Sequence, residues 1–187
     1  MAFDVVEIPV TTVAGEHVEG DVFFNLTSFK IPARSCKLVN MYLQIKRSSA
    51  SDDTKVDDVK LGILFFQKNT QPTLGTLDDT ANISAADFTS NQYIGQQFLF
   101  CDEGSGFMDE NLIDEMMFLY PCSAYTQIGA QVRRGGIFDE MVLKGDAGST
   151  TLYCAGVVHQ DVNSSGAANA PDFNGTDNVK LILQLEY

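Results

Sequence analysis

The side chains best suited to chemistry in this chain are two histidines and a dense set of carboxylates. His17 lies in a polar turn, and His159 ends an apolar run. No serine stands in a G-x-S-x-G motif and no cysteine has a histidine nearby in the sequence, so a hydrolase triad has no local signature. Two histidines are too few for a histidine-rich metal site. We therefore interpret both as surface or strand-end residues, and predict no enzyme, no catalytic residue, no cofactor and no metal.

Glycines and cysteines give no further reactive motif. Gly135-Gly136 and Gly104-x-Gly106 do not open a helix after a strand, as a phosphate-binding loop must, so we interpret them as turn glycines. The cysteines contain no C-x-x-C pair, which argues against a zinc ribbon or a thioredoxin-like pair. We expect buried free thiols in a reducing compartment, with two disulfides as the alternative. The four cysteines are Cys36, Cys101, Cys122 and Cys154.

The carboxylates gather as doublets in two acidic loops, at 52–58 and 102–115. Carboxylates beside glycine turns can bind calcium, but this spacing matches no EF-hand loop. Paired carboxylates can also cleave a glycosidic bond. The chain contains no Trp, however, and so lacks the usual aromatic platform for a sugar. We interpret the loops as solvated, with calcium binding as the alternative.

Charge narrows the classes of partner. The 187 residues include 12 Lys and Arg against 25 Asp and Glu, a net charge of -13. Such a chain lacks the clustered cations that release counterions from nucleic acid, and it is repelled by anionic membranes. No Lys or Arg occurs between Asn69 and Val132, whereas many basic residues precede this block. An electrostatically polar molecule would suit docking of one face onto a larger assembly; the alternative is a simply acidic soluble surface.

Short apolar runs rich in Val, Ile, Phe and Tyr, separated by Gly, Asp, Asn and Ser, predict a multi-stranded β protein. The run from Val59 to Gln67 is apolar on both faces at its far end, which indicates a central strand. Ser84 and Asp87 form a capping box variant at the start of a short helix. The predicted strands cover 5–10, 18–26, 38–46, 59–67, 93–100, 116–120, 125–132, 141–143, 150–159 and 179–187.

No alternation of strands with helices is present, so a doubly wound parallel sheet is disfavoured. We predict an all-β fold, an antiparallel jelly-roll-like β-sandwich with one short helix, with an open barrel as second choice. Residues 1–17 form an N-terminal arm or a first strand, and residues 18–187 form a single β-sandwich domain. The last strand ends the chain, so the C-terminus should be tied into a sheet.

The N-terminal segment is too apolar for a free tail, and Pro9 disfavours a helix. We predict an arm that adds an edge strand to a neighbouring subunit, or else the first strand of its own sheet.

Two arginines could compensate carboxylates of the 102–115 loop where copies meet, so assembly should weaken at very low ionic strength. The possible interaction residues are Val5, Val6, Ile8, Val10, Val13, Arg133 and Arg134.

Several short motifs resemble those of tailed-bacteriophage virion structural proteins. Within Leu61–Asn69 a strand ends in Phe65-Phe66, and Leu74-Gly75-Thr76, Asn82–Asp87 and Ile94-Gly95 follow. The opening, with its apolar stretch before Gly20-Asp21-Val22-Phe23-Phe24, and the closing strands are also similar. The likeness is best over residues 59–100, and the longer segment from Cys101 to Tyr120 departs from it.

This resemblance implies a capsid decoration (cement) protein, which would be a compact β-sandwich on the capsid surface. Its expected partners are the major capsid protein and itself, as a homotrimer, with no nucleic acid and no membrane. The alternatives are a tail or fibre-associated protein, the jelly-roll capsid subunit itself, or a carbohydrate-binding β-sandwich. The first residues lack the basic and apolar regions of a secretory signal, so we expect synthesis in the host cytoplasm.

Overall fold

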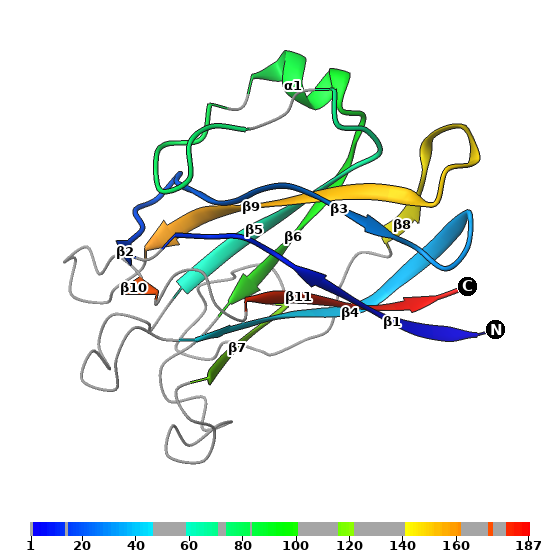
Figure 1. Cartoon of the computed structure of the whole chain (residues 1–187), viewed down its shortest axis with the longest axis horizontal. Helices are drawn as coiled ribbons and strands as arrows, with labels where there is room; N and C mark the ends of the chain where they lie inside the picture. Colours follow the sequence, from blue (N-terminus) through cyan, green and yellow to red (C-terminus); the bar gives the residue numbers. More distant parts are fainter. Residues whose placement is uncertain are drawn as a thin grey trace, which may run out of the picture.

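The computed structural model describes residues 2–13, 15–46, 59–70, 74–82, 84–100, 116–121, 141–161, 172–173 and 179–187. Within these ranges the chain is mostly β-strand, with one α-helix and one short 3₁₀ turn. Figure 1 shows two layers of strands facing each other, with the helix lying above the upper layer. The predicted all-β sandwich is therefore confirmed.

The first layer has the strand order β1-β11-β4-β7. Its strands are β1 (Phe3–Pro9), β11 (Lys180–Glu186), β4 (Ser35–Lys46) and β7 (Met116–Pro121), and all neighbours are antiparallel. The long strand β4 pairs with β7 near one end, and near its other end with β8 (Met141–Lys144).

The second layer has the order β3-β9-β5-β6. Its strands are β3 (Val22–Lys30), β9 (Thr151–Asp161), β5 (Val59–Phe66) and β6 (Tyr93–Phe100), again antiparallel. The layers are joined where the end of β6 pairs with β7. Two short strands, β2 (Gly15–Glu16) and β10 (Asp172–Phe173), pair separately.

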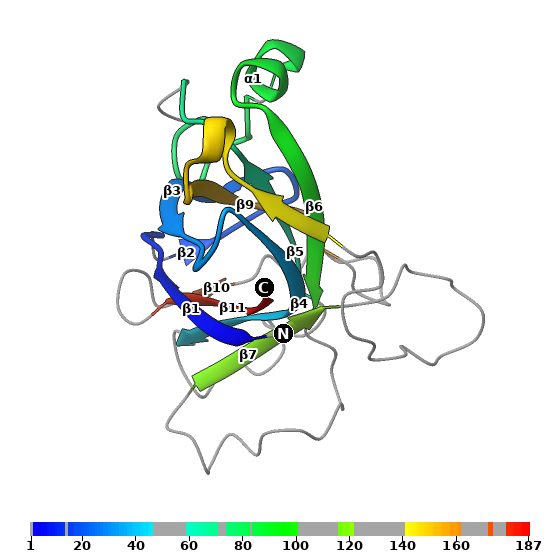
Figure 2. The ribbon, with the colours of Figure 1, turned by 90° about the vertical axis from the view of Figure 1, so that its right-hand side faces the viewer.

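The pairing of the eight long strands is nested along the chain. The first strand pairs with the last (β1 with β11), and the next pairs inward are β3 with β9, β4 with β7 and β5 with β6. Such a long hairpin, rolled into two packed sheets, is the jelly-roll arrangement. Figure 2 shows the rolled layers almost end-on. The topology thus bears out the predicted jelly roll.

The main core lies between the two layers. Side chains alternate across a strand, so every second residue of the facing strands points inward. Leu43, Ile63 and Phe65 are examples, and all three are fully shielded from water. Each such burial stabilises the fold by roughly 1.5–3 kcal/mol. The sandwich is therefore held chiefly by contacts between layers that are distant in sequence.

A second apolar cluster covers the outer face of the β3–β9–β5 layer. Leu64 and Phe66 of β5 point into it, away from the main core. The chain between β5 and β6 folds back over this face, where Leu74 is buried and the Phe88 ring lies 6.0 Å from that of Phe66. β5 is therefore buried on both faces and flanked by β6 and β9, which confirms the prediction of a central strand.

The helix α1 (Ala85–Ser90) begins at the predicted cap. The Asp87 N–H donates to Ser84 Oγ at 3.2 Å, and the Ser84 N–H donates to Asp87 Oδ2 at 2.7 Å. These reciprocal bonds satisfy backbone donors that a short helix would otherwise leave open. The predicted capping box is therefore confirmed.

One predicted strand begins later than expected, and several predicted elements cannot be compared. The strand predicted at 18–26 begins only at Val22, because the chain turns at Glu19–Gly20, where Gly20 has φ 93°. Glycine populates this left-handed region at no steric cost. The strand predicted at 125–132 and the acidic loops at 52–58 and 102–115 lie outside the described residues.

The two ends of the described chain are joined to each other. The Ala2 N–H donates to the Tyr187 carbonyl at 2.9 Å, and the Tyr187 N–H donates to the Ala2 carbonyl at 3.0 Å. β11 lies between β1 and β4, so the C-terminal strand is tied into a sheet, as predicted. Both ends accordingly lie at the same end of the sandwich (Figure 1).

Two cysteines give a testable consequence of this packing. Cys36 and Cys154 are buried free thiols, as predicted for these two, whereas Cys101 and Cys122 lie outside the described residues. Burial raises the pKa of both buried thiols above its usual value. Because the thiolate is the reactive form, both should resist iodoacetamide in the native protein near pH 8.

Peptide mass spectrometry would measure this labelling, with the urea-unfolded chain as the control. Both thiols should react readily once the chain is unfolded. Native labelling of Cys154 at the rate seen in urea would show that it is not buried.

Candidate functional site

A buried histidine stands at the centre of the most concentrated polar chemistry in the described part of the chain. His17 follows β2 directly and has 0% of its surface exposed. Its ring packs edge-on against Phe23, with the centroids 5.4 Å apart. Its Nε2 lies 3.2 Å from the Val13 carbonyl oxygen. The interpretation of His17 as a surface residue was therefore wrong, although it does follow a strand end.

Asp21 approaches the histidine from the turn that leads into β3. The Val18 N–H donates to Asp21 Oδ2 at 2.7 Å, so the aspartate closes the turn with its own side chain, as aspartates in turns often do. Asp21 is only 4% exposed. A buried carboxylate at this position is expensive unless a donor or a cation compensates its charge.

Asp78 reaches the same place from the segment between β5 and α1. Its backbone is left-handed, with φ 60°, a conformation that aspartate tolerates better than most residues. Its N–H donates to the Val22 carbonyl at 3.1 Å, which fixes the segment against the start of β3. Its Oδ1 lies 3.1 Å from His17 Nδ1, and its side chain is 34% exposed.

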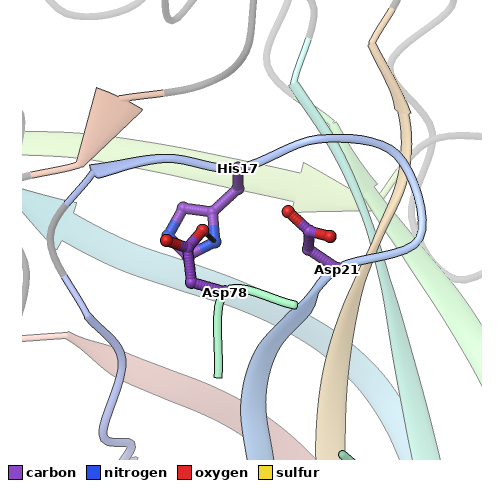
Figure 3. Close-up of side chains that lie close together, drawn as sticks. All are labelled: His17, Asp21 and Asp78. Atoms are coloured by element: carbon purple, nitrogen blue, oxygen red, sulfur yellow. Dashed lines mark ion pairs between the residues drawn. The ribbon is translucent and has the colours of Figure 1, made fainter. Parts of the chain in front are cut away.

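These three residues form what we call the His17 cluster: His17, Asp21 and Asp78. One ligand-type atom from each lies within 4.8 Å of the others. Figure 3 shows the three side chains converging where the β2–β3 turn meets the segment that carries Asp78. An imidazole beside two carboxylates can hold a cation or move a proton. The cluster itself contains no hydroxyl or thiol that could act as a nucleophile.

Sequence reasoning missed this cluster because its members are far apart along the chain. His17 and Asp21 share a turn, but Asp78 lies far along the chain, in the stretch from Asn69 to Val132 that contains no Lys or Arg. No local spacing rule joins them. The spacing of His17 and Asp21 alone does not resemble the metal motifs that a sequence search can recognise.

The structure places the predicted interaction segment within its own sheet. β1 pairs with β11 over seven residues. Ile8 and Val10 are buried in the chain's own core, Val6 and Val13 are partly buried, and Val5 is exposed. The five residues therefore do not share one surface. Arg133 and Arg134 lie outside the described residues.

The open edge of β1 is guarded against pairing with a further strand. The backbone N–H and C=O groups of even-numbered residues bond to β11, as the Ala2–Tyr187 and Val10–Val179 hydrogen bonds show. The backbone groups of odd-numbered residues therefore point toward the open edge. Pro9 has no N–H to offer there, and the Val5 N–H donates to the Asp4 carboxylate at 2.9 Å. Proline and side-chain blocking are common ways to protect a sheet edge.

An exposed apolar surface lies instead on the outer face of the first layer. Phe3, Glu186, Lys37 and Val142 form a row of direct partners across four strands, and Val5 pairs with Gln184 in the next row. Cross-strand partners share a face. The neighbouring pair Cys36 and Leu143 is buried, so this row points outward. We call this surface the β1–β8 face: Phe3, Val5, Lys37, Val142, Gln184 and Glu186.

Comparisons with protein-family models, with curated proteins and with solved structures gave no significant match. Among the described residues, no helix is long and apolar enough to cross a membrane. The features of the described chain that bear on function are therefore the fold, the His17 cluster and the β1–β8 face.

Proposed function

We propose that this chain is a non-enzymatic structural protein of a bacteriophage virion, which binds and stabilises the capsid shell as a decoration (cement) protein. Its motifs resemble such proteins, and the jelly roll is a fold widely used in viral capsids. Fold alone does not determine function, so the proposal needs a surface that could bind the shell.

The β1–β8 face is the observation that carries this proposal. Phe3 is 66% exposed, Val5 57% and Val142 54%. Lys37 and Glu186 balance each other in charge on this face, although the whole chain carries a net charge of -13. The cores of protein interfaces are depleted of charge and enriched in apolar side chains. We assign this face to contact with the major capsid protein and with further copies of the chain in a homotrimer.

Replacing Val142 with Glu tests this assignment. The change places a charge within the proposed contact, where desolvating it opposes binding, so affinity for purified capsids should fall by roughly 10-fold or more. Co-sedimentation with undecorated capsids would measure binding. The temperature of genome release would measure stabilisation of the particles, and capsids mixed with the variant should release their genome at the lower temperature of undecorated particles.

Val18→Glu is the matched control, because Val18 is equally exposed, at 53%, but lies in the turn between β2 and β3. It adds the same charge to the chain and should bind capsids normally. If the two variants bind alike, the β1–β8 face is not the contact. If capsids that lack the wild-type protein prove equally resistant to heat and low salt, the cement role fails.

The nested strand pairing also favours a second candidate, the jelly-roll capsid subunit itself. The two roles differ in what the purified chain does alone. A capsid subunit should assemble into shells without another protein, whereas a decoration protein should bind only to preformed ones. Electron microscopy of the purified chain would distinguish them.

A further inference from the structure

We propose that the His17 cluster is a binding site for a divalent transition-metal ion, and that Zn²⁺ fits its donor set best. Two observations carry the inference: the orientation of the buried imidazole and the charge of the two carboxylates beside it. The site is independent of capsid binding, so either proposal can fail without the other.

The contacts of His17 indicate which ring nitrogen faces the carboxylate of Asp78. A carbonyl oxygen only accepts hydrogen bonds, so the contact of Nε2 with the Val13 carbonyl assigns a proton to Nε2. Nδ1 then faces Asp78 Oδ1 at 3.1 Å, and an ionised carboxylate also only accepts. A neutral imidazole would direct a lone pair at an oxygen anion. A cation bound between them removes this conflict.

The same arrangement is typical of histidines that bind metals. Such a histidine usually donates its other ring N–H to a backbone carbonyl or a carboxylate, which fixes the orientation of the ring. Here the Val13 carbonyl takes that role for His17. The Val18 N–H holds Asp21 in a comparable way, at 2.7 Å. The two buried ligands, His17 and Asp21, are therefore oriented by backbone groups of the β2–β3 turn and of the segment just before β2.

Charge balance favours a divalent ion over a proton. With both carboxylates ionised, the cluster combines two negative charges with a fully buried imidazole, and Asp21 is itself only 4% exposed. A proton on Nδ1 would leave one negative charge in place, whereas a divalent ion neutralises both. Buried carboxylates are stable when they are paired or when they coordinate a metal.

The types of ligand atom in the cluster favour some divalent ions over others. One imidazole nitrogen and two carboxylate oxygens suit Zn²⁺, which is bound by three protein ligands in many sites that keep a fourth position open. Calcium prefers six to eight oxygen ligands and is a poor match. The Asp78 side chain is 34% exposed, so an ion can enter from its side. Binding would fasten the Asp78 segment to the turn before β3.

Calorimetry with ZnCl₂ on the full, chelator-treated chain tests the site. We expect one strongly bound Zn²⁺ per chain, a raised melting temperature, and much weaker binding of Ca²⁺. Asp78→Asn should weaken Zn²⁺ binding by at least ~100-fold, because loss of a direct ligand should exceed the 10–100-fold effect of losing an outer partner. Asparagine also tolerates the left-handed backbone at this position, so the variant should fold.

Asp79→Asn is the matched control, since it removes the same charge from the next residue, whose Oδ1 accepts the Thr80 N–H. It should bind Zn²⁺ like the wild type. Equal binding by the two variants would overturn the proposal, as would the absence of any strong Zn²⁺ site. Circular dichroism of both variants before metal is added would show that each one is folded.

Nitrogen NMR of the imidazoles identifies which histidine binds the ion, which a measurement of overall affinity cannot do. The chain has two histidines, so His159 serves as an internal reference. Zn²⁺ should shift the Nδ1 signal of His17 and leave His159 unchanged, in wild type and in Asp79→Asn. A shift confined to His159, or no shift of His17 at saturating Zn²⁺, would place the ion elsewhere in the chain and overturn the assignment.

Discussion

A chain that begins at Thr11 is expected not to fold. Residues 2–10 include β1, which pairs with β11, and they bury Ile8 and Val10 in the main core. Each of these two side chains contributes roughly 1.5–3 kcal/mol by burial. The deletion also exposes apolar surface of β11. The total loss approaches the whole stability of a typical domain, about 5–15 kcal/mol.

Circular dichroism and urea unfolding would measure this effect, and two single substitutions refine it. Ile8→Ala should lower the free energy of unfolding by about 2–5 kcal/mol, because Ile8 is fully buried. Val5→Ala on the same strand should change it by less than about 0.5 kcal/mol, because Val5 faces solvent. A deletion variant that stays a folded monomer would instead support an arm that joins a neighbouring subunit.

Gly156→Ala is expected to destabilise the fold strongly, although it adds one methyl group to a central strand. Gly156 of β9 pairs directly with Phe24 of β3. A Cβ at Gly156 would overlap a ring carbon of Phe24, whose side chain is completely buried. The ring cannot move without disturbing the core, so we expect a loss of about 2–3 kcal/mol.

Gly62→Ala is the matched control, since Gly62 lies on the adjacent strand β5. Its Cβ would meet the Phe98 ring at 3.5 Å, an ordinary contact. The free energy of unfolding should change by less than about 1 kcal/mol, and the reduced freedom of the unfolded chain favours a gain. Phe24→Leu should partly rescue Gly156→Ala in a double-mutant cycle. Equal losses from the two alanine variants would contradict the proposed clash.

The fold class could be predicted from the sequence, but the pairing of individual strands could not. Short apolar runs and turn residues indicated a β-sandwich, and the apolar pattern of β5 marked it as a central strand. The nested partners of these strands, such as β1 with β11, are long-range contacts. No local pattern specifies them, because any antiparallel neighbour with an apolar inner face satisfies the same alternation.

The His17 cluster also depends on contacts that its sequence neighbours do not indicate. His17 is preceded by Gly15 and Glu16 and followed by a polar turn, so its neighbours suggested exposure. In the folded chain it is fully buried, because Phe23 packs against its ring and the segment carrying Asp78 folds over it. Burial here is a property of two segments that meet, and neither segment alone indicates it.

Features that depend on neighbours along the chain could be predicted from the amino-acid order. The reciprocal hydrogen bonds of Ser84 and Asp87 join residues three apart, and the alternation within β5 is likewise local. The β1–β8 face and the contact of His17 with Asp78 became visible only in the folded chain. These arrangements depend on strand register and on how a long connection folds back. Both are set by burial of the whole core rather than by local preference.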